Sequence, residues 1–162
     1  MGSELTTAPT GRGTSSVLCC ESATKFLRNG HPQMDSPRVL VVEDFKDLRN
    51  LVAFFLDARG YQVLEAGNGT AAIQTALSRN PNFILLDLRL PDIDGLEVAR
   101  ELRKSPATEH IPIVGWSADF PSNPQREALR LAGITDYIQK PISLKALDAL
   151  IERFLPKAKQ QH

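Results

Sequence analysis

Short extended segments and segments with a helical period alternate along the chain from residue 37 onward. The segment from Phe83 to Leu86 is the clearest, since it is wholly apolar, as expected of a strand buried on both faces of a parallel sheet. It ends in a carboxylate, Asp87, and Pro91 and Asp94-Gly95 then mark a turn into the next helix. The five predicted strands are residues 38–42, 61–66, 83–86, 111–116 and 136–139.

Each predicted strand is followed by a segment whose apolar residues recur every three or four positions, as on one face of an amphipathic helix. Gly60 closes the first helix and Gly133 the fourth, since glycine commonly ends helices in the left-handed conformation. Ser143 is a suitable N-cap for the last helix. The other limits are about 70–78, 95–104 and 125–132, and the predicted inward-facing residues are Leu48, Leu51, Val52, Phe55, Leu56, Ile73, Ala76, Leu77, Leu144, Leu147, Leu150, Ile151 and Phe154.

Five strands that alternate with five helices predict an α/β fold with a doubly wound parallel sheet, because parallel neighbours need a crossover connection. The 162 residues have room for one such domain, at 37–156, with a short tail at 157–162. Residues 1–36 are rich in Gly, Ser, Thr and Pro, so we expect them to be disordered. Two interpretations of this leader stay open: a natural disordered segment, or a start-site misassignment with translation beginning at Met34.

Composition excludes several classes of protein. The formal net charge is zero, so there is neither a basic field for nucleic acid nor an acidic field for cationic partners. No apolar run approaches the length of a membrane span, and we therefore expect a soluble protein without a membrane partner. The adjacent Cys19 and Cys20 are too close for an ordinary disulfide, and the patterned region has no cysteine, which fits a cytoplasmic location.

Four of the predicted strands end in residues that carry chemistry: Glu43-Asp44, Asp87, Ser117 and Lys140. Parallel strands present their carboxyl ends at one edge of the sheet, so these groups should meet in one crevice. Carboxylates crowded there repel one another unless a cation joins them, and an all-oxygen ligand set suits Mg²⁺. A hydroxyl and an ammonium supply donors for a charged oxyanion. The combination predicts a metal-assisted phosphoryl site in which an aspartate is the nucleophile.

Taken singly, each of these residues has a simpler interpretation. Glu43-Asp44 could cap the following helix near its positive end. Asp87 could cap a loop, Ser117 could be a loop hydroxyl, and Lys140 could be a solvated charge. Their joint placement at strand ends, in one order, favours a functional site over a coincidence.

These motifs resemble the receiver domain of bacterial two-component response regulators, of the stand-alone, chemotaxis type. The resemblance covers about residues 37–155 and implies a flavodoxin-like sheet with strand order 2-1-3-4-5. It is carried by Glu43-Asp44, by Asp87 followed by Leu90-Pro91-Asp92-Ile93-Asp94-Gly95, by Ser117-Ala118 and by Lys140-Pro141.

The resemblance implies a role for each acidic residue. Asp87 would be the phosphoacceptor. Asp44 and Asp87 would bind Mg²⁺ directly, together with the backbone carbonyl of Arg89, and Glu43 would act mainly through water. The phosphoryl donor would be a sensor histidine kinase, a histidine phosphotransfer protein or a small acyl phosphate.

The remaining motif residues would bind the phosphoryl group and report its presence. Ser117 and Lys140 would each contact a phosphoryl oxygen, and the Lys140-Pro141 peptide would be cis. Movement of Ser117 would free space for Tyr137, at the position of the switch aromatic in the family. The face of the fourth helix, fifth strand and fifth helix would then bind a downstream protein or a second copy of the chain. Its exposed candidates are Arg126, Arg130, Gln139, Lys145 and Asp148.

The chain departs from the family pattern at Arg89 and at Gly115-Trp116. Arg89, two residues after the acceptor, is larger and more basic than is usual there, and its side chain could reach over the phosphoryl site. Gly115-Trp116 replaces a pair of aliphatic residues before Ser117. We expect Trp116 to pack in the core and Gly115 to make room for it.

The predicted function is that of a single-domain response regulator, which catalyses only its own phosphorylation and dephosphorylation and is not a turnover enzyme. A phosphohydrolase of the aspartyl-phosphate kind is disfavoured, because Arg89 stands where a second acid would be needed and no segment could cap a substrate. A receiver-like interaction module that works without phosphorylation is the alternative. Its usual sign is loss of an acidic, acceptor or lysine position, and none is lost here.

Overall fold

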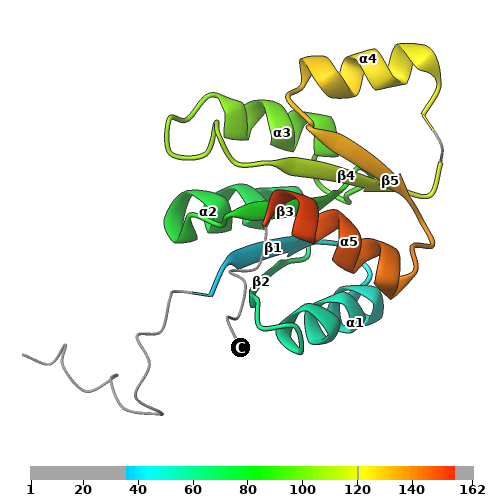
Figure 1. Cartoon of the computed structure of the whole chain (residues 1–162). Coiled ribbons are helices and arrows are strands. Elements are labelled where there is room, and N and C mark those ends of the chain that lie inside the picture. Colours follow the sequence, from blue (N-terminus) through cyan, green and yellow to red (C-terminus); the bar gives the residue numbers. More distant parts are fainter. Residues whose placement is uncertain (1–35, 120, 156–162) are drawn as a thin grey trace, which may run out of the picture. The chain divides into compact units, whose positions relative to one another are not determined.

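The computed structural model describes residues 36–119 and 121–155, and within them five strands alternate with five helices (Figure 1). The predictions for the leader, including a start at Met34, and for the tail at 157–162 lie outside the described residues. No helix in the described part is long and apolar enough to cross a membrane. The elements are β1 (Arg38–Val42), α1 (Lys46–Asp57), β2 (Gln62–Ala66), α2 (Gly69–Arg79), β3 (Phe83–Asp87), α3 (Gly95–Arg103), β4 (Ile113–Ser117), α4 (Asn123–Leu131), β5 (Asp136–Gln139) and α5 (Leu144–Phe154).

All strand pairs are parallel, and their order is β2-β1-β3-β4-β5, which confirms the predicted doubly wound fold. β3 lies in the middle of the sheet, with Leu86 beside Val42 of β1 and Gly115 of β4. Every residue of β3 is buried, both the apolar run 83–86, as predicted, and Asp87 at its end. The carboxyl ends of β1, β3 and β4 therefore lie next to one another.

The sheet separates two apolar cores, because successive side chains of a strand point to opposite faces. One core contains Val41, Leu85 and Trp116 and packs against α1 and α5. The other contains Leu40 and Ile84 and packs against α2, α3 and α4. Figure 1 shows the two groups of helices on opposite sides of the sheet.

The inward orientation predicted for three leucines is wrong. Leu51, Leu77 and Leu144 are 51%, 45% and 37% exposed. Alanines occupy the buried arc instead: Ala53 in α1 and Ala72 in α2 lie against the sheet. Because these alanines face the sheet, the neighbouring leucines of α1 and α2 lie at the edge of the contact. Leu144 is exposed for a different reason, since it is the first residue of α5.

Helix ends follow local hydrogen bonds that shift some of the predicted boundaries. α4 begins two residues before the predicted position, because Gln125 Oε1 accepts from both the N–H (2.8 Å) and the hydroxyl (2.9 Å) of Ser122. Ser143 caps α5 as predicted, since its Oγ accepts from the N–H of Ala146. Gly60 and Gly133 have positive φ angles, of 86° and 85°.

The start of α3 packs directly on the loop that follows Asp87. A Cβ atom at Gly95 would lie 2.6 Å from the carbonyl oxygen of Asp87 and 2.7 Å from the Cα of Leu88. The N–H of Gly95 also donates to the carbonyl of Leu88, at 3.2 Å. Only glycine permits this approach, and it fixes the backbone on the carboxyl side of Asp87.

Substituting Gly95→Ala is expected to lower the free energy of unfolding by about 1 to 3 kcal/mol, because the added methyl group meets backbone that cannot yield. The matched control is Gly115→Ala, whose Cβ would meet only the flexible side chain of Leu88, at 3.2 Å. Urea denaturation of both variants measures the difference. An equal loss of stability in the two would contradict the argument.

Candidate functional site

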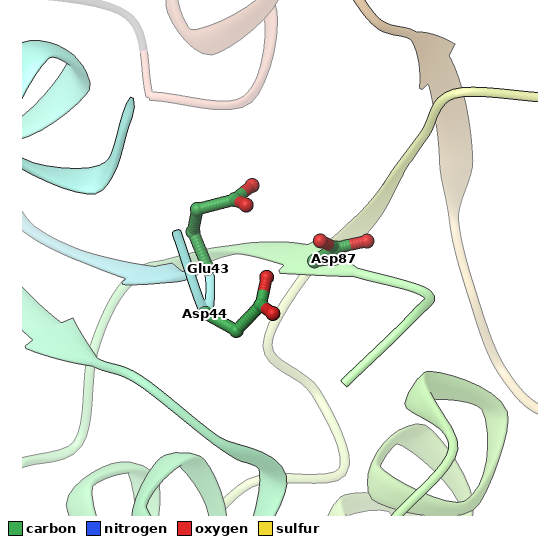
Figure 2. Close-up of side chains that lie close together, drawn as sticks. All are labelled: Glu43, Asp44 and Asp87. Atoms are coloured by element: carbon green, nitrogen blue, oxygen red, sulfur yellow. The ribbon is translucent and has the colours of Figure 1, made fainter. Parts of the chain in front are cut away.

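Three carboxylates meet where β1 and β3 end. One oxygen from each of Glu43, Asp44 and Asp87 lies within 4.8 Å of the others, and Figure 2 shows the side chains converging from the two strand ends. Glu43 is 1% exposed and Asp87 4%, whereas Asp44 lies on the surface. The cluster is thus an acidic pocket with one open side.

Lys140, which follows β5, joins the two buried carboxylates. Its Nζ donates to Glu43 Oε2 at 2.6 Å and to Asp87 Oδ2 at 2.7 Å. The backbone N–H of Lys140 donates to the carbonyl of Ser117 at 2.7 Å, and the Lys140-Pro141 peptide is cis, as the family resemblance implied. The ends of β1, β3, β4 and β5 are therefore tied together at one edge of the sheet.

The charges of this pocket depend on one another. Burial raises the pKa of Glu43, and the hydrogen bond from Lys140 offsets part of that rise. Burial acts to lower the pKa of Lys140, but its bonds to Asp87 and Glu43 outweigh it, so the pKa is raised. The lysine stays cationic at neutral pH. One ammonium thus serves a cluster of three carboxyl groups, and this all-oxygen set fits a hard divalent cation such as Mg²⁺.

Ser117 and Arg89 border the pocket. The N–H of Arg89 donates to Asp87 Oδ1 at 2.9 Å, so its backbone lies at the acidic cluster. Its side chain extends to the loop after β4 and forms an ion pair with Asp119. Ser117 is buried, and its Oγ accepts from the N–H of Asp119 at 3.3 Å. An exposed ion pair thus connects the loops that follow β3 and β4.

The loop between Asp87 and α3 is also held from the side. Asp92 accepts hydrogen bonds from the N–H groups of Gly69 and Thr70, both at 2.8 Å, and from the hydroxyl of Thr70 at 2.7 Å. These bonds lower the pKa of Asp92 and cap the start of α2. Sequence reasoning placed Asp92 only within a motif, because its partners are more than twenty residues away.

In the predicted switch region and the face beside it, one residue, Asp148, differs from the prediction. Tyr137 is half-buried, with the guanidinium of Arg126 5.5 Å from its ring centre. Arg126, Arg130, Gln139 and Lys145 are exposed as predicted. Asp148 is not, since its side chain is only 16% exposed and pairs with Arg59. Its prediction as a surface residue of this face is wrong because Arg59, beyond the end of α1, reaches over it.

Two contacts of the site were missed from the sequence. Arg49 in α1 donates to the carbonyl of Glu43 at 2.6 Å and pairs with Glu65 at 3.3 Å, which fixes the backbone of the acidic pair. The sequence offered one indication that Arg49 lies near the sheet, since it directly follows the inward-facing Leu48. Trp116 lies in the core as predicted, but its ring also faces Lys140, with Nζ 4.7 Å from the ring centre.

The prediction for Gly115 is wrong. Adjacent strand residues point to opposite faces, so Gly115 cannot make room for Trp116. It lies on the face of α2, α3 and α4, where a Cβ would approach the side chain of Leu88. Because Gly115 has no side chain, there is room beside it for Leu88, the residue that follows Asp87.

Comparison with known proteins gives a consistent result. The family model of the response regulator receiver domain matches residues 39–152. The polar-differentiation response regulator DivK of Brucella anthropi is 33% identical over 120 residues, which cover 74% of this chain and 97% of DivK.

Solved structures show the same similarity. Chemotaxis protein CheY4 of Vibrio cholerae has a TM-score of 0.70 at 24% identity, covering 74% of this chain and 98% of that one, a likeness of fold. The receiver domain of the sensor histidine kinase PA1611 of Pseudomonas aeruginosa, with a magnesium ion coordinated in its active site cleft, has a TM-score of 0.68 at 29% identity. That likeness covers 74% of this chain and 98% of the PA1611 domain.

Substituting Lys140→Met is expected to destabilise the protein by about 2 kcal/mol at pH 7, less than for a fully buried pair because part of the lysine is exposed. The loss should shrink toward pH 4.5, the ordinary pKa of a glutamate, and it should also shrink in millimolar Mg²⁺. The pKa of Glu43 in the folded state is raised, and it rises further when Lys140 is removed. The loss of stability caused by Lys140→Met therefore grows as the pH rises through the folded-state pKa of Glu43, because the carboxylate then ionises without its partner.

Urea denaturation across this pH range, with and without Mg²⁺, measures the effect. Lys104→Met is the matched control. Lys104 is an exposed lysine at the C-cap of α3, and it pairs with Glu101 of the same helix. A loss for Lys140→Met that is independent of pH and Mg²⁺ would show that the destabilisation does not come from uncompensated carboxylates.

Proposed function

The chain belongs to the response regulator receiver domain family, and on that premise we propose that it is a cytoplasmic, Mg²⁺-dependent phosphoacceptor of a two-component phosphorelay. Receiver domains are signalling phosphoacceptors rather than turnover enzymes, and they interact with histidine kinases or phosphotransfer proteins. They bind Mg²⁺ at an acidic pocket. The finer assignment concerns which residues of this chain perform each step.

In the proposed reaction an Oδ atom of Asp87 attacks the phosphorus of a phosphohistidine or an acyl phosphate. A P–O bond to Asp87 forms, and the P–N or P–O bond of the donor breaks, with the electron pair leaving on the donor. Lys140 moves from the Asp87 carboxylate to a phosphoryl oxygen. The hydroxyl of Ser117 leaves its contact with the N–H of Asp119 and donates to a second phosphoryl oxygen. Asp44, Asp87 and the carbonyl of Arg89 would hold Mg²⁺, with Glu43 acting through water, and the ion would supply positive charge for the transferred group.

The observation that carries this proposal is the lysine shared between two buried carboxylates, beside a third that is open to solvent. A purely structural ion pair does not need the third carboxylate. A site that accepts a phosphoryl group needs a nucleophile, a cation for the incoming oxygens and a place for a metal, and these residues supply all three.

Output would follow from a change in the environment of Tyr137. Once Ser117 turns toward the phosphoryl group, the ring of Tyr137 takes up the space beside β4, and the contact with Arg126 is released. The surface formed by α4, β5 and α5 then changes its affinity for a downstream protein or for a second copy of the chain. Arg126, Arg130, Gln139 and Lys145 are among its exposed charged and polar residues.

The direct test is the intact mass after incubation with acetyl phosphate, with and without Mg²⁺. The wild type is expected to gain one phosphoryl group only when Mg²⁺ is present, and Asp87→Asn to gain none, because its amide is a poor nucleophile. Asp94→Asn is the control in the same loop, since asparagine also caps helices and Asp94 caps α3.

The outcome of this test separates the two functional interpretations. A phosphoryl gain that persists in Asp87→Asn would remove Asp87 from its proposed role. No gain from acetyl phosphate or from a phosphorylated histidine phosphotransfer protein, in a folded chain that binds Mg²⁺, would favour an interaction module that works without phosphate.

Arg89→Ala is expected to shorten the lifetime of the phosphorylated form by about two- to fivefold, in line with the strength of an exposed ion pair. The pair with Asp119 connects the loops beside Asp87, so its loss gives water easier access to the phosphorus. Decay of the phosphorylated mass over time gives the lifetime. Arg100→Ala, which removes an exposed ion pair within α3, is the control, and a longer lifetime for Arg89→Ala would contradict the proposed shielding.

A further inference from the structure

The ring of Trp116 forms one wall of the Lys140 site. Trp116 is 1% exposed, belongs to the core shared with α1 and α5, and is the residue of β4 that pairs with Asp87 of β3. Lys140 Nζ lies 4.7 Å from the ring centre while it donates to Glu43 and Asp87. The ammonium is thus held by two carboxylates and by the face of an indole, within the range of a cation–π contact.

The indole nitrogen of Trp116 gives an independent indication that the ring has a purpose beyond packing. Nε1 is buried and has no hydrogen-bond partner within the described part of the chain. A buried tryptophan N–H usually finds an acceptor, and leaving one unsatisfied costs stability. An aliphatic side chain would fill a core position without this cost. The attraction between the ring face and the ammonium is a contact that offsets this cost.

The carboxylates alone would hold Lys140 less firmly once a divalent cation binds beside them. A divalent cation held among Glu43, Asp44 and Asp87 would compete with the ammonium for carboxylate charge, and the two cations would repel each other. The face of an aromatic ring attracts an ammonium but offers no oxygen to a hard metal ion. The ring therefore holds the lysine without competing for the metal.

We propose that Trp116 is a positioning residue that keeps the Lys140 ammonium beside Asp87 when a divalent cation occupies the acidic pocket. The inference rests on the proposed function, since it concerns the lysine that receives the phosphoryl oxygen. Trp116 does not touch the reacting atoms itself. It acts by keeping Lys140 within reach of them.

The test exploits the fact that the chain has a single tryptophan. Growth on mono-, di- and trifluorotryptophan places fluorine only at residue 116, and fluorine weakens the negative face of the ring far more than it changes its volume. The rate of phosphoryl gain from acetyl phosphate in saturating Mg²⁺ is expected to fall stepwise, by about threefold or more across the series. A rate that is unchanged by fluorination, in protein that is phosphorylated, would overturn the proposal.

A second measurement does not require phosphorylation. The midpoint of urea denaturation in Mg²⁺ is expected to fall across the fluorinated series in the wild type and to stay constant in Lys140→Met, because only the first has a cation over the ring. Lys104→Met, an exposed lysine variant, should behave as the wild type. An equal fall in both Lys140 backgrounds would assign the effect to packing alone and overturn the proposal.

The two measurements also separate failure of the inference from failure of the proposed function. If the unmodified protein gains no phosphoryl group from any donor, the proposed function has failed, and the denaturation series alone then decides whether the ring holds the lysine. If phosphorylation proceeds but neither measurement depends on fluorine, the proposed function stands and the role of Trp116 is rejected.

Discussion

The site depends on one electrostatic constraint: two carboxylates buried at neighbouring strand ends need a cation. Lys140 meets that need from the loop after β5, and its backbone N–H is bonded to the end of β4, so the edge of the sheet closes around the charge. In the proposed chemistry this bridge rearranges, because the ammonium moves from the Asp87 carboxylate to a phosphoryl oxygen.

The backbone around Asp87 is positioned from several directions. Gly95 brings α3 against it from one side, and Asp92 ties the same loop to α2. Arg49 holds the carbonyl of Glu43 on the opposing strand. These contacts fix the backbone that carries the buried carboxylates, whereas the pair of Arg89 and Asp119 is exposed to solvent.

Local patterns predicted the fold and the gathering of the site well, since both depend on the sequence of one element at a time. The bounds of β1 and β5 agree with the prediction, and the strand-end residues meet because parallel strands share an edge. The errors at Leu51, Gly115 and Asp148 have one cause: each depends on which neighbour packs beside the residue. Such lateral contacts, like that between Trp116 and Lys140, join residues far apart in the chain and leave no periodic signal.

The position of Trp116 also determines what light can report about this protein. Because the chain has one tryptophan, its indole emission originates 4.7 Å from the ammonium at the acidic pocket. A nearby charge changes the energy of the excited indole, so displacement of that ammonium alters the emission without any attached dye. The protein thus carries its own optical probe at the place where the proposed reaction rearranges its charges, and rapid mixing can follow the emission in the unmodified chain.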